Sequence, residues 1–229
     1  MSYILVTTLY QDLTCCWSRA ARIAIAEKNI KADLADFHTE KTVENTLCPY
    51  FTDADGTEVV GGFFVLEYMN DAYPDRDMMG PTAAIRAETR RLTALLAEPV
   101  SAGIVEPLYK EKILNPRARR SGIEVSPFDS RAVRSANDAM VAYAQFIGDV
   151  FNQRGWLSYA NFSYADAMAM GQISMLDMAS LIPWTELSAK APGFRNWYAK
   201  AKSRPAFRSI VGDRLPDVAP PTYYSNPDF

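Results

Sequence analysis

The chain has 229 residues, enough for one large or two small domains, and its 48% hydrophobic and 22% charged residues are typical of a folded globular protein. Its 24 basic and 27 acidic residues sum to −3, so no positive excess attracts nucleic acid or anionic lipid. One histidine, His38, and three cysteines, Cys15, Cys16 and Cys48, are too few for a histidine-rich metal site, and no metal is expected. No apolar run approaches the roughly 20 residues of a membrane span, and no signal peptide is apparent. We therefore expect a cytoplasmic protein with reduced thiols.

The first 75 residues alternate between strand and helix patterns. In chain order they predict a strand at 4–9, a helix at 17–28, a strand at 31–37, a hairpin at 49–60 and a helix at 62–73. The first strand is a β-branched apolar run, the first helix has a natural stop at Asn29, and the hairpin turns at Asp55-Gly56. This order of elements is that of a thioredoxin-like α/β domain.

After Pro81 the pattern is helical throughout. Apolar residues recur at helical spacing over 84–114, 129–151, 167–181, 192–202 and 204–211. Pro99 and Pro107 should kink or divide the first of these stretches, and Ser163-Tyr164-Ala165-Asp166 has the form of a capping box. We predict an α+β fold with a thioredoxin-like domain at 1–76, a linker at 77–83 and an all-α helical-bundle domain with an extended tail at 84–229.

Two segments of the first half resemble the glutathione transferase family. Ser18-Arg19-Ala20-Ala21-Arg22 is similar to the start of the family's first helix, which puts Cys15 at the position of the nucleophile in the Cys-type classes. Leu47-Cys48-Pro49-Tyr50-Phe51 resembles the segment with a cis proline that holds the cysteinyl part of glutathione. The resemblance implies the glutathione transferase fold, with Cys15 as candidate nucleophile and Cys48 and Pro49 as ligand-binding residues.

Physical chemistry supports the assignment of Cys15, because unpaired amides at a helix N-terminus favour a thiolate. The same fold would bring all three thiols to one surface. The alternative for each cysteine is a small buried apolar residue.

A third segment departs from the family pattern. Counted back from Glu67-Tyr68, the positions that the resemblance assigns to an acidic residue and a serine, which hold the γ-glutamyl carboxylate, are Gly61 and Gly62. Losing two charge-assisted contacts of about 1.5–3 kcal/mol each would weaken glutathione binding about 10² to 10⁴-fold. The stretch 36–47 is also short for a full second helix. We expect no cofactor. Glutathione is expected to bind only weakly at the four ligand positions Cys48, Pro49, Gly61 and Gly62.

Later segments resemble one branch of the family, whose members bind the tubulin-like division protein FtsZ as dimers and are not known for glutathione chemistry. The matching segments are Ile182-Pro183-Trp184 and residues 60–62, 105–112, 196–208, 213–216 and 223–229. This resemblance implies a non-enzymatic cell-division factor that binds FtsZ filaments. It also implies a homodimer in which one thioredoxin-like domain lies against the partner's helical domain. Tyr224, Asp228 and Phe229 are the candidate partner-binding residues of the tail.

Two other functions remain open. The first is a Cys-type glutathione transferase or thiol transferase with Cys15 as nucleophile. The second is a thiol redox switch in which Cys48 pairs with Cys15 or Cys16.

Overall fold

The structure is a computed structural model of the chain and describes residues 6–40, 47–216 and 218. Their strands form a four-stranded mixed sheet in the order β2-β1-β3-β4. The central strand β1 (Thr8–Gln11) pairs in parallel with β2 (Asp33–Asp36) and antiparallel with β3 (Tyr50–Thr52). β3 and β4 (Glu58–Val60) form the hairpin predicted at the Asp55-Gly56 turn. The first strand lies later than predicted, and Ile4 and Leu5 are outside the described residues.

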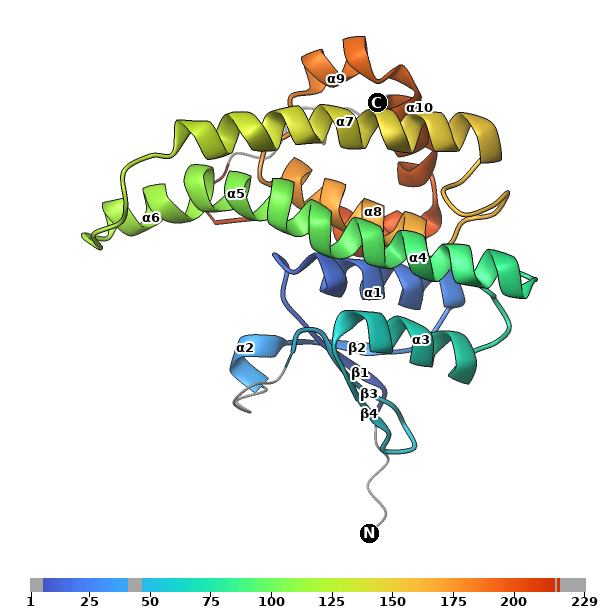
Figure 1. Cartoon of the computed structure of the whole chain (residues 1–229). Coiled ribbons are helices and arrows are strands. Elements are labelled where there is room, and N and C mark those ends of the chain that lie inside the picture. Colours follow the sequence, from blue (N-terminus) through green and yellow to red (C-terminus); the bar gives the residue numbers. More distant parts are fainter. Residues whose placement is uncertain (1–5, 41–46, 217, 219–229) are drawn as a thin grey trace.

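Two helices pack on this sheet. α1 (Cys16–Lys28) ends at Asn29, which has a left-handed φ of 54°, as its sequence predicts, and α3 (Gly62–Ala72) follows the hairpin. The stretch after β2, expected from the sequence to be short for a full second helix, contains the four-residue helix α2 (Phe37–Glu40). In Figure 1, α1 lies between the sheet and the helices of the second half, so both faces of α1 are covered.

The second half begins with a long helical stretch from residue 83 to residue 120. It comprises α4 (Ala83–Val100), a π-helical turn at Ser101–Val105, α5 (Glu106–Tyr109), a second π-helical turn at Lys110–Leu114 and α6 (Asn115–Arg120). Pro99 and Pro107 are expected from the sequence to kink or divide this stretch; the helical backbone continues through both, and a π-helical turn follows each proline and separates the α-helical pieces. A proline removes one backbone donor and crowds the preceding turn, and wider π turns absorb such a local mismatch without ending the helix.

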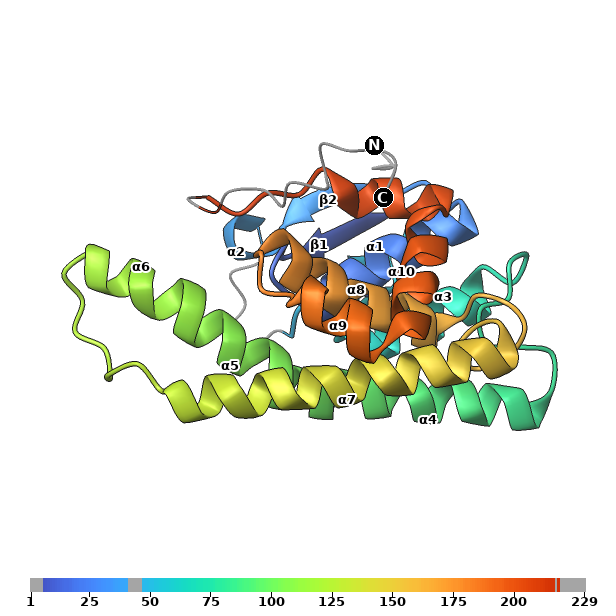
Figure 2. The same ribbon diagram turned by 90° about the horizontal axis from the view of Figure 1, so that it is seen from above.

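The remaining helices complete the bundle. They are α7 (Ser130–Arg154), α8 (Tyr164–Met178), α9 (Trp184–Lys190), α10 (Pro192–Lys202), a 3₁₀ turn at Pro205–Phe207 and α11 (Arg208–Val211). Figure 2 shows α7 lying along the outside of the bundle beside α9 and α10. α9 has no counterpart among the predicted elements.

The helix α8 is the centre of the bundle, because all of its residues are buried. The predicted capping box is present: the Ser163 backbone N–H and hydroxyl both donate to Asp166 Oδ2, at 3.1 and 2.7 Å. Asp166 Oδ1 accepts from the Leu157 backbone and from Trp197 Nε1, both at 3.1 Å. This carboxylate therefore ties the start of α8 to α10.

The fold is thus a thioredoxin-like domain joined to an all-helical domain, as the sequence predicts. α3 ends at Ala72 and α4 begins at Ala83. The domain limits of 1–76 and 84–229, with a linker between them, stay predictions.

Candidate thiol site at the start of α1

Cys15 lies where the chain leaves the sheet and enters α1. It is the N-cap residue, with extended backbone angles (φ −85°, ψ 116°). The preceding loop is held by Asp12, whose backbone carbonyl accepts from Cys15 N at 3.1 Å and whose Oδ1 accepts from the Thr14 N–H and hydroxyl at 2.6 and 2.9 Å. The position of the half-buried Cys15 thiol is therefore fixed by both the loop and the helix.

Cys48 reaches the same place from the other side. It lies two residues before the start of β3, and its peptide bond to Pro49 is cis, as the family resemblance implies. The Cys15 thiol lies 3.7 Å from the backbone oxygen of Cys48, and Cys48 Sγ lies 3.0 Å from the Ser18 hydroxyl. Ser18 is fully buried and also accepts from the Asp12 N–H at 3.1 Å. Sequence reasoning missed this bridging role, because Ser18 entered it only as part of the helix-start motif.

The two thiols differ in acidity. The pKa of Cys15 falls from 9.0 to about 6, mainly through the hydrogen bond from the Cys48 thiol. Burial opposes this fall, and the backbone N–H groups of Ser18 and Trp17 and the Ser18 hydroxyl support it. The pKa of Cys48 is raised by its hydrogen bond to Cys15 and by burial. Because the helix N-terminal donors face Cys15, it is the cysteine that ionises first.

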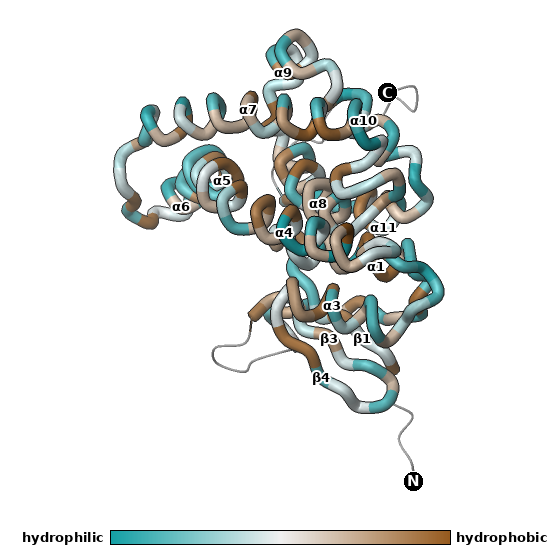
Figure 3. The backbone as a smooth tube through the Cα atoms, turned by 45° about the vertical axis from the view of Figure 1, so that its right-hand side comes forward, coloured by the Kyte–Doolittle hydropathy of each residue, from teal (hydrophilic) through white to brown (hydrophobic). Residues whose placement is uncertain are grey.

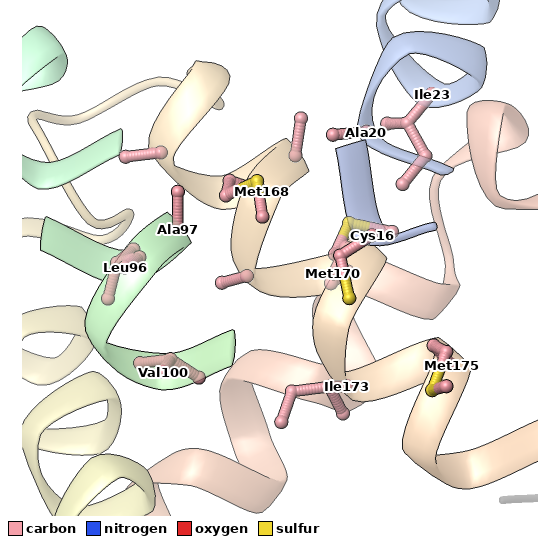
Figure 4. Close-up of a cluster of buried hydrophobic side chains, with 14 of the residues drawn as sticks. Cys16, Ala20, Ile23, Leu96, Ala97, Val100, Met168, Met170, Ile173 and Met175 are labelled. Atoms are coloured by element: carbon pink, nitrogen blue, oxygen red, sulfur yellow. The ribbon is translucent and has the colours of Figure 1, made fainter. Parts of the chain in front are cut away.

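Cys16 does not join this pair. In Figure 4 its side chain lies beside Met170 in the core between α1 and α8. Burial is the main reason that its pKa rises to about 12, and the charge on Cys15 adds to it. The expectation that all three thiols gather at one surface is therefore wrong for Cys16, and the alternative, a small core residue, is confirmed. Cys16 is the first residue of α1 and is buried, whereas Cys15 lies before the helix in extended conformation, so the two neighbouring side chains leave the backbone in different directions.

An ion pair lies on the solvent side of the loop. His38 Nε2 is 2.8 Å from Asp12 Oδ2. The hydrogen bond to Asp12 raises the pKa of His38, and the charges on Asp12, Asp36 and Cys15 raise it further. Burial opposes ionisation of Asp12, yet hydrogen bonds from His38 and Thr14 lower its pKa. Protonated His38 thus adds positive charge near the Cys15 thiolate.

The two glycines at the start of α3 adjoin an aromatic ring. Gly61 is the N-cap, with φ +89°, where a side chain would be strained. A Cβ built on Gly62 would lie 2.3 Å from the indole ring of Trp17, and the same ring packs edge-on against Phe63 with centroids 6.5 Å apart. A serine at position 62 therefore does not fit unless Trp17 moves.

The arginines of the helix-start motif bind the C-terminal segment. Asp213 Oδ2 accepts from Arg19 Nη1 at 2.6 Å and from Arg22 Nη1 at 2.8 Å, while Asp213 Oδ1 accepts from Arg22 Nη2 at 3.0 Å. All three side chains are at least nine-tenths buried. The segment that leads to the tail is thereby attached to the helix that carries Cys15.

Similarity to known proteins identifies the family. No protein-family profile matches the chain. FtsZ-localized protein A of Caulobacter vibrioides is 31% identical over 165 residues, which are 72% of this chain and 68% of that protein. This chain belongs to the same family.

Solved structures agree with this assignment. FzlA from C. crescentus superposes with a TM-score of 0.84 at 25% identity, covering 98% of this chain and all of that one. A glutathione S-transferase from Rhodospirillum rubrum F11 gives a TM-score of 0.83 at 29% identity over 97% of this chain and 100% of its own. The family of FtsZ-localized protein A therefore has the glutathione transferase fold, as the residues of the first half indicated.

Three further observations concern the rest of the site. The candidate partner-binding residues Tyr224, Asp228 and Phe229 lie outside the described residues. Among residues 6–40, 47–216 and 218, no group of three or more histidine, cysteine or acidic side chains could hold a metal. Across the same ranges, no helix is long and apolar enough to cross a membrane.

Proposed function

We propose that this chain is a non-enzymatic, cytoplasmic cell-division factor that binds FtsZ filaments and whose glutathione site has degenerated. The observation that carries the proposal is the start of α3, where Gly61 and Gly62 replace the two carboxylate-binding residues that the family resemblance implies. The space next to Gly62 is filled by the Trp17 ring. A γ-glutamyl carboxylate here would lose water and meet an apolar ring instead of a polar partner.

The thiol half of the ligand position persists, because Cys15, Cys48 and cis Pro49 still meet there. Glutathione would therefore keep the contacts around its sulfur and lose those at its carboxylate. A site of this kind supports binding about 10² to 10⁴-fold weaker than an intact one.

Similarity to FtsZ-localized protein A supports FtsZ as the partner. The buried contact of Arg19 and Arg22 with Asp213 fixes the point from which the tail departs. Tyr224, Asp228 and Phe229 lie within 16 residues of that point in sequence and combine aromatic and acidic groups suited to a protein partner.

A homodimer is part of the proposal. Leu47, Val60 and Phe64 are large apolar residues with exposed fractions of 63%, 36% and 62%. The side chains of Phe64 and Leu47 both lie within 4 Å of the point where a Cβ on Gly61 would stand. Figure 3 shows apolar colouring on β4, which ends one residue before Gly61. Such a cluster at the edge of the thioredoxin-like domain is suited to burial against a second copy.

The deciding experiment is co-sedimentation with polymerised FtsZ. We expect the full chain to pellet with the filaments and a chain ending at Pro220 to stay in the supernatant. A chain with residues 221–229 in scrambled order, which keeps length and charge, is the matched control for the sequence of the tail. Equal pelleting of all three chains would rule out the tail as the binding element, and no pelleting of the full chain would rule out FtsZ.

The dimer has its own test. Phe64→Glu should convert the protein to a monomer in size-exclusion chromatography with light scattering. Phe128→Glu changes a side chain of similar exposure, 51%, in the loop before α7 and should leave the dimer intact. A wild-type protein that elutes as a monomer would contradict the proposal.

A second function has one observation in its favour, the lowered pKa of Cys15. A thiol transferase would use this thiolate to attack a mixed disulfide of glutathione, releasing the substrate thiol and leaving glutathione on Cys15. Deglutathionylation that is lost in Cys15→Ala but kept in Cys16→Ala, together with no FtsZ pelleting, would favour this function over the first.

A further inference from the structure

We propose that Cys15 and Cys48 are a redox-active pair in which Cys15 reacts with a hydroperoxide and Cys48 then closes an intramolecular disulfide, while Cys16 stays reduced. This activity needs neither glutathione nor a protein partner. It concerns two thiols that come from different elements and lie 33 positions apart in sequence.

The geometry brings the two sulfurs together at an accessible place. Cys15 Sγ is 3.7 Å from the backbone oxygen of Cys48, and Cys48 Sγ is 3.0 Å from the hydroxyl of Ser18 in the first turn of α1, the helix that Cys15 caps. Both side chains are half-buried, so neither is sealed in the core. A cysteine sulfur moves by rotation about a single Cα–Cβ bond, so the sulfurs of two residues already in contact can approach each other by side-chain rotation.

The surroundings give the two thiols different roles. Cys15 is at the N-cap of α1, and its pKa is lowered to about 6, mainly by Cys48 and also by the backbone N–H groups of Ser18 and Trp17. Cys48 keeps its proton and lies 3.0 Å from the Ser18 hydroxyl. A thiolate beside a protonated thiol is the arrangement of an attacking cysteine and a resolving cysteine.

The reaction balances with hydrogen peroxide as the hydroperoxide. The Cys15 thiolate attacks one peroxide oxygen, the O–O bond breaks, and Cys15 becomes a sulfenic acid while hydroxide leaves. The hydroxide takes the proton of Cys48 and becomes water. The resulting Cys48 thiolate attacks Cys15 Sγ, the S–O bond breaks, and the second hydroxide takes a proton from solvent. The two cysteine sulfurs each lose one electron, and the peroxide is reduced to two waters.

Cys16 provides an internal control, because it carries the same functional group one residue away. Cys16 is only 8% exposed, its thiol lies in the core, and burial raises the pKa of this thiol to about 12. It should therefore neither react with peroxide nor reach Cys48 while the protein is folded.

The test is peptide mapping of the folded protein after exposure to hydrogen peroxide, followed by alkylation, unfolding and a second alkylation. Trypsin leaves Cys15 and Cys16 on one peptide ending at Arg19 and Cys48 on another, so the variants Cys15→Ala, Cys16→Ala and Cys48→Ala assign the bond. We expect a cross-linked peptide pair in wild type and in Cys16→Ala, its loss in the other two variants, and its reversal by dithiothreitol. In Cys48→Ala, Cys15 should gain oxygen instead.

Three results would overturn the proposal. They are a wild-type protein that keeps all three thiols, a cross-link that persists in Cys15→Ala, and a bond between two chains instead of within one. Wild-type mapping alone decides the first and third, so the proposal remains testable if a variant fails to fold. None of these results bears on FtsZ co-sedimentation, which tests the proposed function separately.

Discussion

Replacing Cys48 by alanine should raise the pKa of Cys15. The hydrogen bond from the Cys48 thiol is the largest cause of the fall from 9.0 to about 6, which corresponds to about 4 kcal/mol in favour of the thiolate. A hydrogen bond to a charged group is worth about 1.5–3 kcal/mol. At about 1.4 kcal/mol per pH unit, its loss should raise the pKa by roughly one to two units.

The assay is the pH dependence of alkylation of Cys15 by iodoacetamide, followed by peptide mass. The wild-type midpoint should lie near 6, that of Cys48→Ala clearly higher, and that of Cys16→Ala unchanged, because Cys16 is not among the groups that lower the pKa of Cys15. Equal midpoints in wild type and Cys48→Ala would refute the reasoning, as would a wild-type midpoint near 9.

The same shift makes a prediction for stability. The pKa of Cys15 is lower in the folded protein than its unfolded value of 9.0. The contribution of the Cys15 thiolate to the free energy of unfolding is therefore fully present above pH 9 and is lost as the pH falls through about 6. The difference in unfolding free energy between wild type and Cys15→Ala, measured with urea, should therefore grow from pH 6 to pH 9. A difference that shrinks over this range would contradict the assignment of the thiolate to Cys15.

Four further substitutions test other parts of the structure by urea unfolding. Asp213→Ala leaves Arg19 and Arg22 without their buried carboxylate and should lower the free energy of unfolding by about 3–5 kcal/mol. A decrease below about 1 kcal/mol would show that this contact is not formed. Gly62→Ala should lower the free energy of unfolding by about 1–3 kcal/mol, because its methyl group would crowd Trp17. Trp17→Ala should lower it less in the Gly62→Ala protein than in wild type. If the effects of the two substitutions simply add, the contact between residue 62 and Trp17 is not formed. Burial raises the pKa of Asp166 from 3.8 to about 6, so the contribution of protonated Asp166 to the free energy of unfolding is fully present below pH 3.8 and is lost as the pH rises through about 6. The free energy of unfolding of Asp166→Asn should therefore change less between pH 3.8 and pH 6 than that of wild type. An equal pH dependence of the two proteins would contradict this assignment.

Local sequence patterns were sufficient for the elements whose signals are confined to a few residues. α1 stops at Asn29 because this residue takes the left-handed conformation and its backbone N–H bonds back to the last turn. In the hairpin turn and in the capping box at Ser163, Asp side chains accept from nearby backbone N–H groups. Long helices with one apolar stripe, such as α7, were also predicted, because burial of that stripe sets their period.

Other features were not predictable at this level. The helix continues past Pro99 and Pro107 because π turns and packing against neighbouring helices compensate the lost backbone bonds, and no local signal marks those turns. The short helix α9 lacks a strong pattern of its own and is packed by Trp184, whose ring stacks on Phe194 and Tyr198 of α10.

For the site, the sequence by itself determined which residues were available: the thiols, the cis proline segment and the glycine pair at Gly61 and Gly62. The tertiary structure decided how they meet. It turned Cys16 into the core, brought the Cys15 thiol to the backbone oxygen of Cys48, placed the Trp17 ring against Gly62, and fixed Arg19 and Arg22 on Asp213. The contacts between distant segments join residues that are 30 positions apart, for Ser18 and Cys48, to 194 positions apart, for Arg19 and Asp213. Only packing of the folded chain brings such groups within bonding distance.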